Sequence, residues 1–205
     1  DDDDQSHELL CLAKTNEGHK NLMRIISLAH NNYNFQTPII DFANLTELKD
    51  DIVVISGGKD SHIFNLLKRN KTEDAEKRID QFLKAFDDDF VLEVQRTNRL
   101  DENEYFANLL PLSSKKGIPL IATNDVLFAK EEDFDIHETK VCINTGKTLN
   151  DPNREKLFSQ EQYFKSSAEM ESLFDGFDEL ITNTIEISKK CNVSIHTKNY
   201  FLPEY

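Results

Sequence analysis

The sequence predicts an α/β domain in which strands alternate with helices, arranged either as a barrel or as an open sheet. Short apolar runs rich in branched residues alternate with longer segments whose apolar residues recur at helical spacing. The chain has 205 residues, of which 38% are hydrophobic and 30% charged, as expected for one domain with a sizeable core and a charged surface. Because helices separate the strands, we expect parallel pairing with the helices outside.

The strands are predicted from short apolar runs bounded by polar or glycine residues. They are Leu9–Ala13, a short piece at Ile39–Asp41, Asp51–Ser56, Phe90–Val94 and Pro119–Ala122. The helices between them are predicted from one-sided apolar patterns. They cover Asn16–His30, Phe42–Leu48, Asp60–Asn70, Thr72–Phe86 and a segment that starts with a capping box of Asp101 and Glu104 and ends at Lys116.

From Asp133 the pattern becomes mostly helical, which divides the chain into β/α units over 1–132 and a helical part over 133–205. The predicted helices are Phe134–Asn144, one that is capped by Ser166 and Glu169 and runs through Phe174, and Phe177–Lys190. Extended pieces at Val193–Ile195 and Tyr200–Pro203 are expected to pack back on the body.

The net charge of −14 argues against direct contact with a nucleic-acid backbone, because phosphate neutralisation needs clustered Lys and Arg. Proteins or cations are the expected partners. Cys11, Cys142 and Cys191 are far apart, which predicts buried thiols in a reducing, cytoplasmic compartment. The charge run Asp1–Asp4 leads directly into a strand, and this indicates a piece of a longer chain.

Polar residues follow three of the predicted strands, where α/β folds place their chemistry. These segments are Ser56-Gly57-Gly58-Lys59, Arg96-Thr97-Asn98 and Asn124-Asp125, the last before an acidic loop with His137. Gly57-Gly58 could cradle a phosphate with help from Lys59, but the motif fits no known phosphate loop and a tight turn is favoured. Asn124 and Asp125 are likewise ordinary turn residues, so a turn is favoured there on residue types alone.

A metal site would need ligands that converge from several strands, and only Asp125 is well placed for it. His7, His62 and His137 lie near predicted strand ends or on the helices that follow, without the spacing of a metal motif. No nucleophile elbow and no spaced carboxylate pair is present in the sequence. The residues therefore indicate an acidic α/β domain with one partial site.

Five segments resemble, in order, the PHP (polymerase and histidinol phosphatase) domain of bacterial DNA polymerase III alpha subunits. They are LLCLAKTNEGHKNLMRIISLA, VVISGGKDSHIFNLLKRN, VLEVQRTNRLDENEY, PLIATNDVLFAKEEDFDIHETKVCINTGKTLNDPNR and YFLPEY. The resemblance implies a distorted (β/α)7 TIM-like barrel at the N-terminus of a replicative polymerase. It also implies that the opening strands, with their HxH motif, lie outside this chain.

The family's metal-ligand positions can be carried over one at a time. The His that opens the first strand falls on Glu8, or on His7 if the register shifts by one residue. The Cys of the family's SGC turn falls on Gly58, and the His of its QRH turn on Thr97. In the ATNDVH motif the Asp is retained as Asp125, whereas the His is replaced by Leu127.

These losses predict no catalytic residue, no cofactor and no functional zinc or manganese in this segment, since Gly, Thr and Leu supply no charge-balancing ligands. Magnesium would belong to the polymerase site outside this chain. The resemblance then implies a non-catalytic scaffold that stabilises the polymerase and docks the proofreading exonuclease subunit and other replicase subunits, with DNA contacted only through the parent protein.

Two alternatives remain open at the level of sequence. An active metal-dependent phosphoesterase, acting as a 3′–5′ exonuclease or pyrophosphatase, would need His7 and His62 to replace the lost ligands. An unrelated α/β protein would require the five motif matches to be accidental. Sheet edges left by missing strands could also promote dimerisation.

Overall fold

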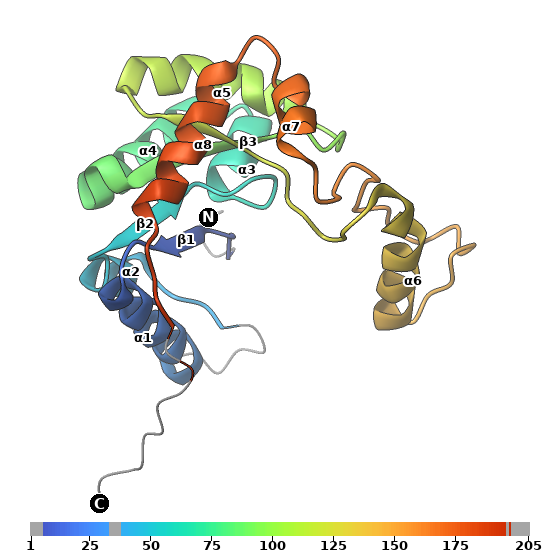
Figure 1. Cartoon of the computed structure of the whole chain (residues 1–205), viewed down its shortest axis with the longest axis horizontal. Coiled ribbons are helices and arrows are strands. Elements are labelled where there is room, and N and C mark those ends of the chain that lie inside the picture. The colour runs from blue at the N-terminus through green and yellow to red at the C-terminus, as the bar shows by residue number, and fades with distance from the viewer. Residues whose placement is uncertain (1–5, 33–37, 196, 198–205) are drawn as a thin grey trace, which may run out of the picture.

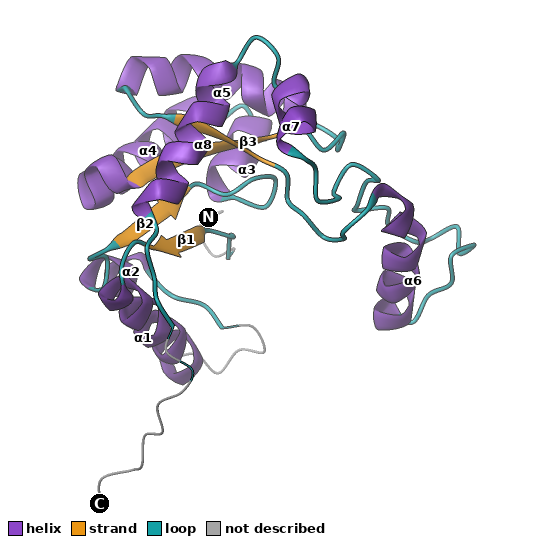
Figure 2. Ribbon diagram, viewed as in Figure 1, coloured by secondary structure: helices purple, strands orange, loops and turns teal. Residues whose placement is uncertain are grey.

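The centre of the molecule is a four-stranded sheet, described here from a computed structural model that covers residues 6–32, 38–195 and 197. The strand order is β1-β2-β3-β4 (Figures 1 and 2). The strands are β1 (Leu10–Ala13), β2 (Ile52–Ile55), β3 (Phe90–Gln95) and β4 (Leu120–Thr123). Strands β2, β3 and β4 are parallel, and β1 runs antiparallel to β2.

The predicted parallel pairing is confirmed for β2–β4 and is wrong for β1. Two helices, α1 (Asn16–Asn32) and α2 (Phe42–Glu47), connect β1 to β2 and return the chain to the end of β1 where it left. There the Lys14 amide donates to the Asp51 carbonyl at 2.8 Å, and the Thr15 hydroxyl donates to the Asp51 carboxylate at 2.7 Å. The α/β class is thus correct, but the described sheet is open and the predicted barrel is not confirmed.

The remaining helices lie close to their predicted positions. They are α3 (His62–Lys68), α4 (Thr72–Phe86), α5 (Glu102–Lys116), α6 (Phe134–Thr145), α7 (Ser167–Leu173) and α8 (Asp178–Lys190), with single 3-10 turns at η1 (Asp87–Asp89) and η2 (Glu131–Asp133). Ser166 and Glu169 form the expected capping box at the start of α7. Helix α6 and the chain on either side of it extend away from the sheet (Figure 1).

Two local predictions are wrong. Residues 39–41 form no strand, because the Asp41 side chain instead caps α2 by accepting the Asn44 amide at 2.7 Å. Asp101 makes no side-chain cap for α5 and has a positive φ of 70°.

Three of the sequence segments lie outside the described residues. They are the extended piece predicted at Tyr200–Pro203, the YFLPEY segment and Asp1–Asp4.

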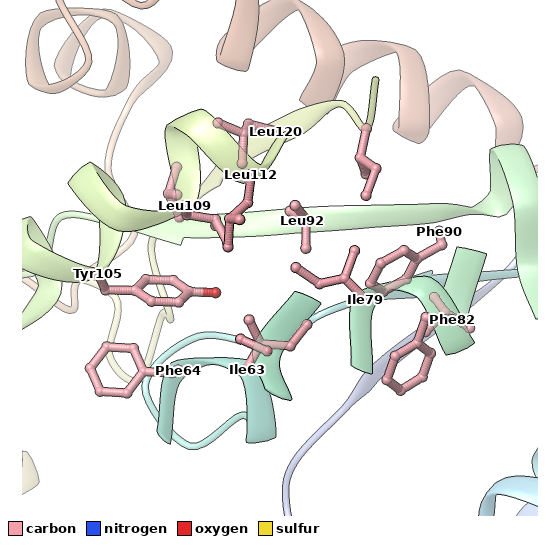
Figure 3. Close-up of a cluster of buried hydrophobic side chains, with 14 of the residues drawn as sticks. Ile63, Phe64, Ile79, Phe82, Phe90, Leu92, Tyr105, Leu109, Leu112 and Leu120 are labelled. Carbon is pink, nitrogen blue, oxygen red and sulfur yellow. The ribbon is translucent and has the colours of Figure 1, made fainter. Parts of the chain in front are cut away.

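The main core fills the space between one face of the sheet and helices α3, α4 and α5 (Figure 3). Phe90 on β3 is 1% exposed, and its ring stacks on Phe82 of α4 with centroids 5.0 Å apart. Ile63, Ile79 and Leu109 from the three helices are fully buried in the same cluster. Burial of this face fixes the strand register, because a one-residue slip would turn each apolar side chain to the other face.

The opposite face of the sheet carries a smaller apolar cluster of Val53, Ile55, Val91 and Ile121, which Ile187 of α8 covers. The chain beyond α8 runs back toward α1, where the Asn192 amide donates to the Lys14 carbonyl at 2.7 Å. This second face is the one on which polar residues gather at the strand ends.

Helix α8 also shields the outer edge of β4. The Thr184 hydroxyl accepts the Ala122 amide at 3.1 Å and lies 3.0 Å from the Ala122 carbonyl, while the Asn183 side-chain amide donates to the Leu120 carbonyl at 2.9 Å. An unpaired strand edge invites pairing with another chain. Because α8 occupies these groups, the β4 edge is closed to strand addition.

Thr184→Val removes the acceptor of the Ala122 amide without a large change in shape, together with the hydroxyl proton that lies within reach of the Ala122 and Leu180 carbonyls. We expect a loss of ~1–3 kcal/mol in unfolding free energy, measured by urea denaturation. Thr182→Val on the same helix is the matched control, since that exposed hydroxyl bonds only to Asp178 of its own helix. Equal stabilities for the two variants would contradict the edge-shielding role.

Candidate functional site

The carboxyl ends of β3 and β4 carry a group of buried polar side chains. Glu93 and Gln95 occupy alternate positions of β3 and share the face that is apolar at Val91, and Thr97 follows two residues after the strand ends. Thr123 pairs with Gln95 in the register of the two strands, and the Gln95 amide lies 3.3 Å from its hydroxyl. The second sheet face therefore changes from apolar to polar at the strand ends.

Arg99 lies at the centre of this polar group. Its Nη1 contacts the Asp125 carboxylate at 2.9 Å, its Nη2 donates to Gln95 Oε1 at 2.8 Å, and its Nε donates to Thr97 Oγ1 at 2.8 Å. The Arg99 side chain is only 7% exposed. All three nitrogens of the guanidinium thus have acceptors from the strand ends.

Glu102 provides the second negative charge beside Arg99. Its carboxylate accepts the Thr97 amide at 2.7 Å and the Thr97 hydroxyl at 2.5 Å, and it contacts Arg99 Nε at 3.1 Å. Glu102 is 5% exposed. A buried charge needs a partner and hydrogen bonds, and Arg99 with Thr97 supplies both. Glu102, rather than the predicted Asp101, therefore organises the start of α5.

Because Gly58 has no side chain, the Gln95 side chain can fill the space beside it. A Cβ added at Gly58 would lie 2.3 Å from Gln95 Oε1 and 2.5 Å from its Cδ. Gln95 cannot easily move, since it is buried and held by Arg99 and by Glu93, whose Oε1 accepts the Gln95 amide at 3.3 Å. The Gly57-Gly58 segment is thus a tight turn packed against protein groups, with Gly57 at a φ of 81°.

Asp125 connects Arg99 to the loop before α7. The Gln162 side chain donates to Asp125 Oδ2 at 2.8 Å, and the Gln162 carbonyl accepts the Leu127 amide at 2.9 Å. The Ser159 hydroxyl donates to the Thr97 carbonyl. The structure therefore links the family positions Thr97, Asp125 and Leu127 through one loop, in which Gln162 is fully buried.

Glu93 lies beneath this network. Burial raises the pKa of Glu93 above its ordinary value, and the charge of Asp125 adds to that increase. Hydrogen bonds from Thr123 and Gln95 and the charge of Arg99 act in the opposite direction. The cationic guanidinium thus lies among three carboxyl groups, those of Glu93, Glu102 and Asp125.

Of the other sequence candidates, Glu8 lies beside the Gly57-Gly58 turn, where its amide donates to the Asp60 carbonyl at 3.2 Å. The rings of His7 and His62 stack on each other, with centroids 4.4 Å apart, in a pocket that Glu8 also lines. His137 packs edge-on against Phe158, with centroids 4.8 Å apart, on the α6 side of the molecule. The residues that line this histidine pocket do not include Gly58, Thr97, Asp125 or Leu127.

Four of the five positions carried over from the resemblance offer no free side-chain ligand for a metal ion. Gly58 has no donor group, Leu127 is apolar, and Thr97 donates its hydroxyl proton to Glu102. Asp125 is ion-paired with Arg99, whose positive charge opposes a cation at the same place. Within the described ranges, no three His, Cys, Asp or Glu side chains converge as a metal-ligand group.

Sequence reasoning missed Arg99, Gln95 and Glu102. The alternation of Glu93, Gln95 and Thr97 was a usable signal, because polar residues at every second position of a buried strand predict one shared polar face. The filling of the Gly58 position by Gln95 had no local signal, since Gly58 lies in the loop after β2 and Gln95 lies on β3.

Comparison with known proteins finds a match to a family model. The sequence model of the PHP domain matches residues 1–97, so this part of the chain is similar to the PHP domain. The PHP match thus includes Gly58, Gln95 and Thr97, whereas Arg99, Glu102 and Asp125 lie beyond it.

Nearly the whole chain is similar to the DNA polymerase III subunit alpha of several bacteria. It is 40% identical over 203 residues to the Vibrio cholerae protein, 38% identical over 203 residues to the Escherichia coli K12 protein and 36% identical over 206 residues to the Pseudomonas aeruginosa protein. These alignments cover 98%, 98% and 100% of this chain. The chain spans only 18% of the length of each relative.

Gly58→Ala tests the packing of this PHP site. We expect it to destabilise the chain by ~1–3 kcal/mol, because the added methyl group overlaps the held Gln95 amide. Gln95→Ala in the same chain should relieve the overlap, so that the double variant is more stable than the sum of the two single changes implies. Urea unfolding of all four chains measures this coupling, and strict additivity would show that the two residues do not compete for space.

Proposed function

We propose that this chain is a non-catalytic PHP segment of a replicative DNA polymerase III alpha subunit in the cytoplasm. In this proposal it stabilises the polymerase and docks the proofreading exonuclease subunit, while the parent protein carries out template-directed DNA synthesis with magnesium at a site outside this segment. Other replicase subunits are further partners, and DNA is contacted only through the parent protein.

The observation that carries the proposal is the ion pair between Arg99 and Asp125, at 2.9 Å. Asp125 is the one metal-ligand residue retained in the resembling motif, and its carboxylate is already engaged by a cation of the protein itself. The identity of 36–40% to polymerase III alpha subunits over at least 98% of the chain supports the replicase setting.

Exposed apolar side chains support a role in protein contacts. Ile136 and Ile143 on α6 are 57% and 77% exposed, and Phe164 at the end of the following loop is 74% exposed. Clustered exposed apolar residues are typical of interaction sites. The described helices include none that is long and apolar enough to span a membrane.

The active-phosphoesterase alternative is not supported by these contacts. It required His7 and His62 to replace lost ligands, but their rings stack on each other in a pocket on the α2 side of the sheet, which Phe42 and Ile40 also line. We therefore propose that the PHP positions hold neither zinc nor manganese.

Metal analysis of the purified chain tests the catalytic part of the proposal. After incubation with zinc or manganese and desalting, we expect no more bound metal in the wild type than in Asp125→Ala. We also expect no metal-dependent release of phosphate from a phosphomonoester or of nucleotides from a DNA 3′ end. Stoichiometric metal that is lost in Asp125→Ala, together with hydrolysis, would establish the phosphoesterase instead.

Binding to the proofreading exonuclease subunit of the same replicase tests the docking part. We expect a complex between that subunit and the full polymerase polypeptide that contains this chain, measured by calorimetry. Ile143→Asp with Phe164→Asp should weaken it if the α6 region contributes, whereas Ile26→Asp, a similarly exposed residue on α1 (58%), serves as the control. Absence of any complex with the wild-type polypeptide would contradict the docking role.

A further inference from the structure

We infer that Arg99 is a built-in cation that takes the place of a metal ion at the strand ends of this PHP domain. The inference deepens the proposed function, since it rests on the claim that these positions hold no metal. It assigns to Arg99 a positioning role: the guanidinium holds the carboxyl ends of β3 and β4 and the start of α5 in one arrangement.

The contacts of Arg99 have the geometry of a central cation. A guanidinium offers five N–H donors in a fixed planar fork. Arg99 directs Nη1 to Asp125, Nη2 to Gln95 and Nε to both Thr97 and Glu102, at distances between 2.8 and 3.1 Å. Like a metal ion, it collects oxygen atoms from segments that are distant in sequence.

Arg99 also balances the charge of two carboxylates. Glu102 is only 5% exposed and is largely separated from water, whereas the Asp125 side chain is 36% exposed. Carboxylates placed close together repel unless a cation lies among them. The buried Arg99 supplies that cation, and removing one partner of a buried pair leaves the other charge uncompensated.

The space beside Gly58 is filled by protein. The resemblance implies a Cys ligand at the Gly58 position in metal-binding relatives, and here the Gln95 amide fills the volume that a side chain would need. Gln95 Oε1 in turn accepts a hydrogen bond from Arg99 Nη2. The three residues therefore depend on one another. Gln95 needs the space that Gly58 leaves, and Arg99 needs Gln95 as an acceptor.

Chemical rescue of Arg99→Ala tests the inference without any partner protein or catalytic assay. Truncation leaves a space for a guanidinium group, so millimolar methylguanidinium should bind there and stabilise the folded chain. Arg99→Ala should lower the melting temperature by roughly 6–20 °C, and methylguanidinium should recover part of that loss. Sodium chloride at equal ionic strength should recover none.

Arg24→Ala is the matched control, because Arg24 is an exposed α1 residue that bonds only to Asn21 within its own helix. We expect neither a large loss nor rescue for this variant, and no rescue of the wild type. Arg99→Lys should melt between the wild type and Arg99→Ala, because one ammonium keeps the charge but cannot make all four contacts.

Two results of the melting experiment would overturn the inference. One is a melting temperature of Arg99→Ala like that of Arg24→Ala, and the other is no response to methylguanidinium beyond that to sodium chloride.

If Arg99→Ala does not fold by itself, refolding is followed by circular dichroism with and without methylguanidinium. Folding only with methylguanidinium supports the role, and failure in both conditions overturns it. A failed exonuclease complex would leave this result unchanged, so the two proposals fail separately.

Discussion

The guanidinium of Arg99 lies between two carboxylates, Glu102 and Asp125, that belong to the segments following different strands. Its contacts to Gln95 and Thr97 add the end of β3 to the same group. Without a cation at this point, the buried Glu102 carboxylate would lose its ion-pair partner, which costs on the order of several kcal/mol. The position of the loop at 159–162 depends on the same residues, because Ser159 bonds to Thr97 and Gln162 to Asp125.

Packing of the rest of the fold holds the strand ends around Arg99 in place. The large apolar core between α3, α4, α5 and one sheet face fixes the register of β3, and with it the shared direction of Glu93 and Gln95. Helix α8 holds the other side by hydrogen bonds to the free edge of β4. The polar group is therefore rigid on two sides, and this suits a structural role for a site that resembles a catalytic one.

Much of the fold was predictable because strand and helix patterns are local. The apolar runs of β2 and β3 and the one-sided pattern of α4 identified those elements to within a residue or two. The antiparallel β1 was not predictable, since it depends on how α1 and α2 return the chain. The location of Asp125 at a strand end was also predictable, but its partner Arg99 was not, because an ion pair across a sheet depends on three-dimensional placement.

The most direct measurement of the central claim is anomalous X-ray scattering from crystals of the chain grown with zinc or manganese chloride. The account predicts density for the Arg99 guanidinium within hydrogen-bonding distance of Gln95, Thr97, Glu102 and Asp125, and no anomalous peak among these residues. A strong peak beside the Asp125 carboxylate, with Arg99 displaced from it, would contradict the account.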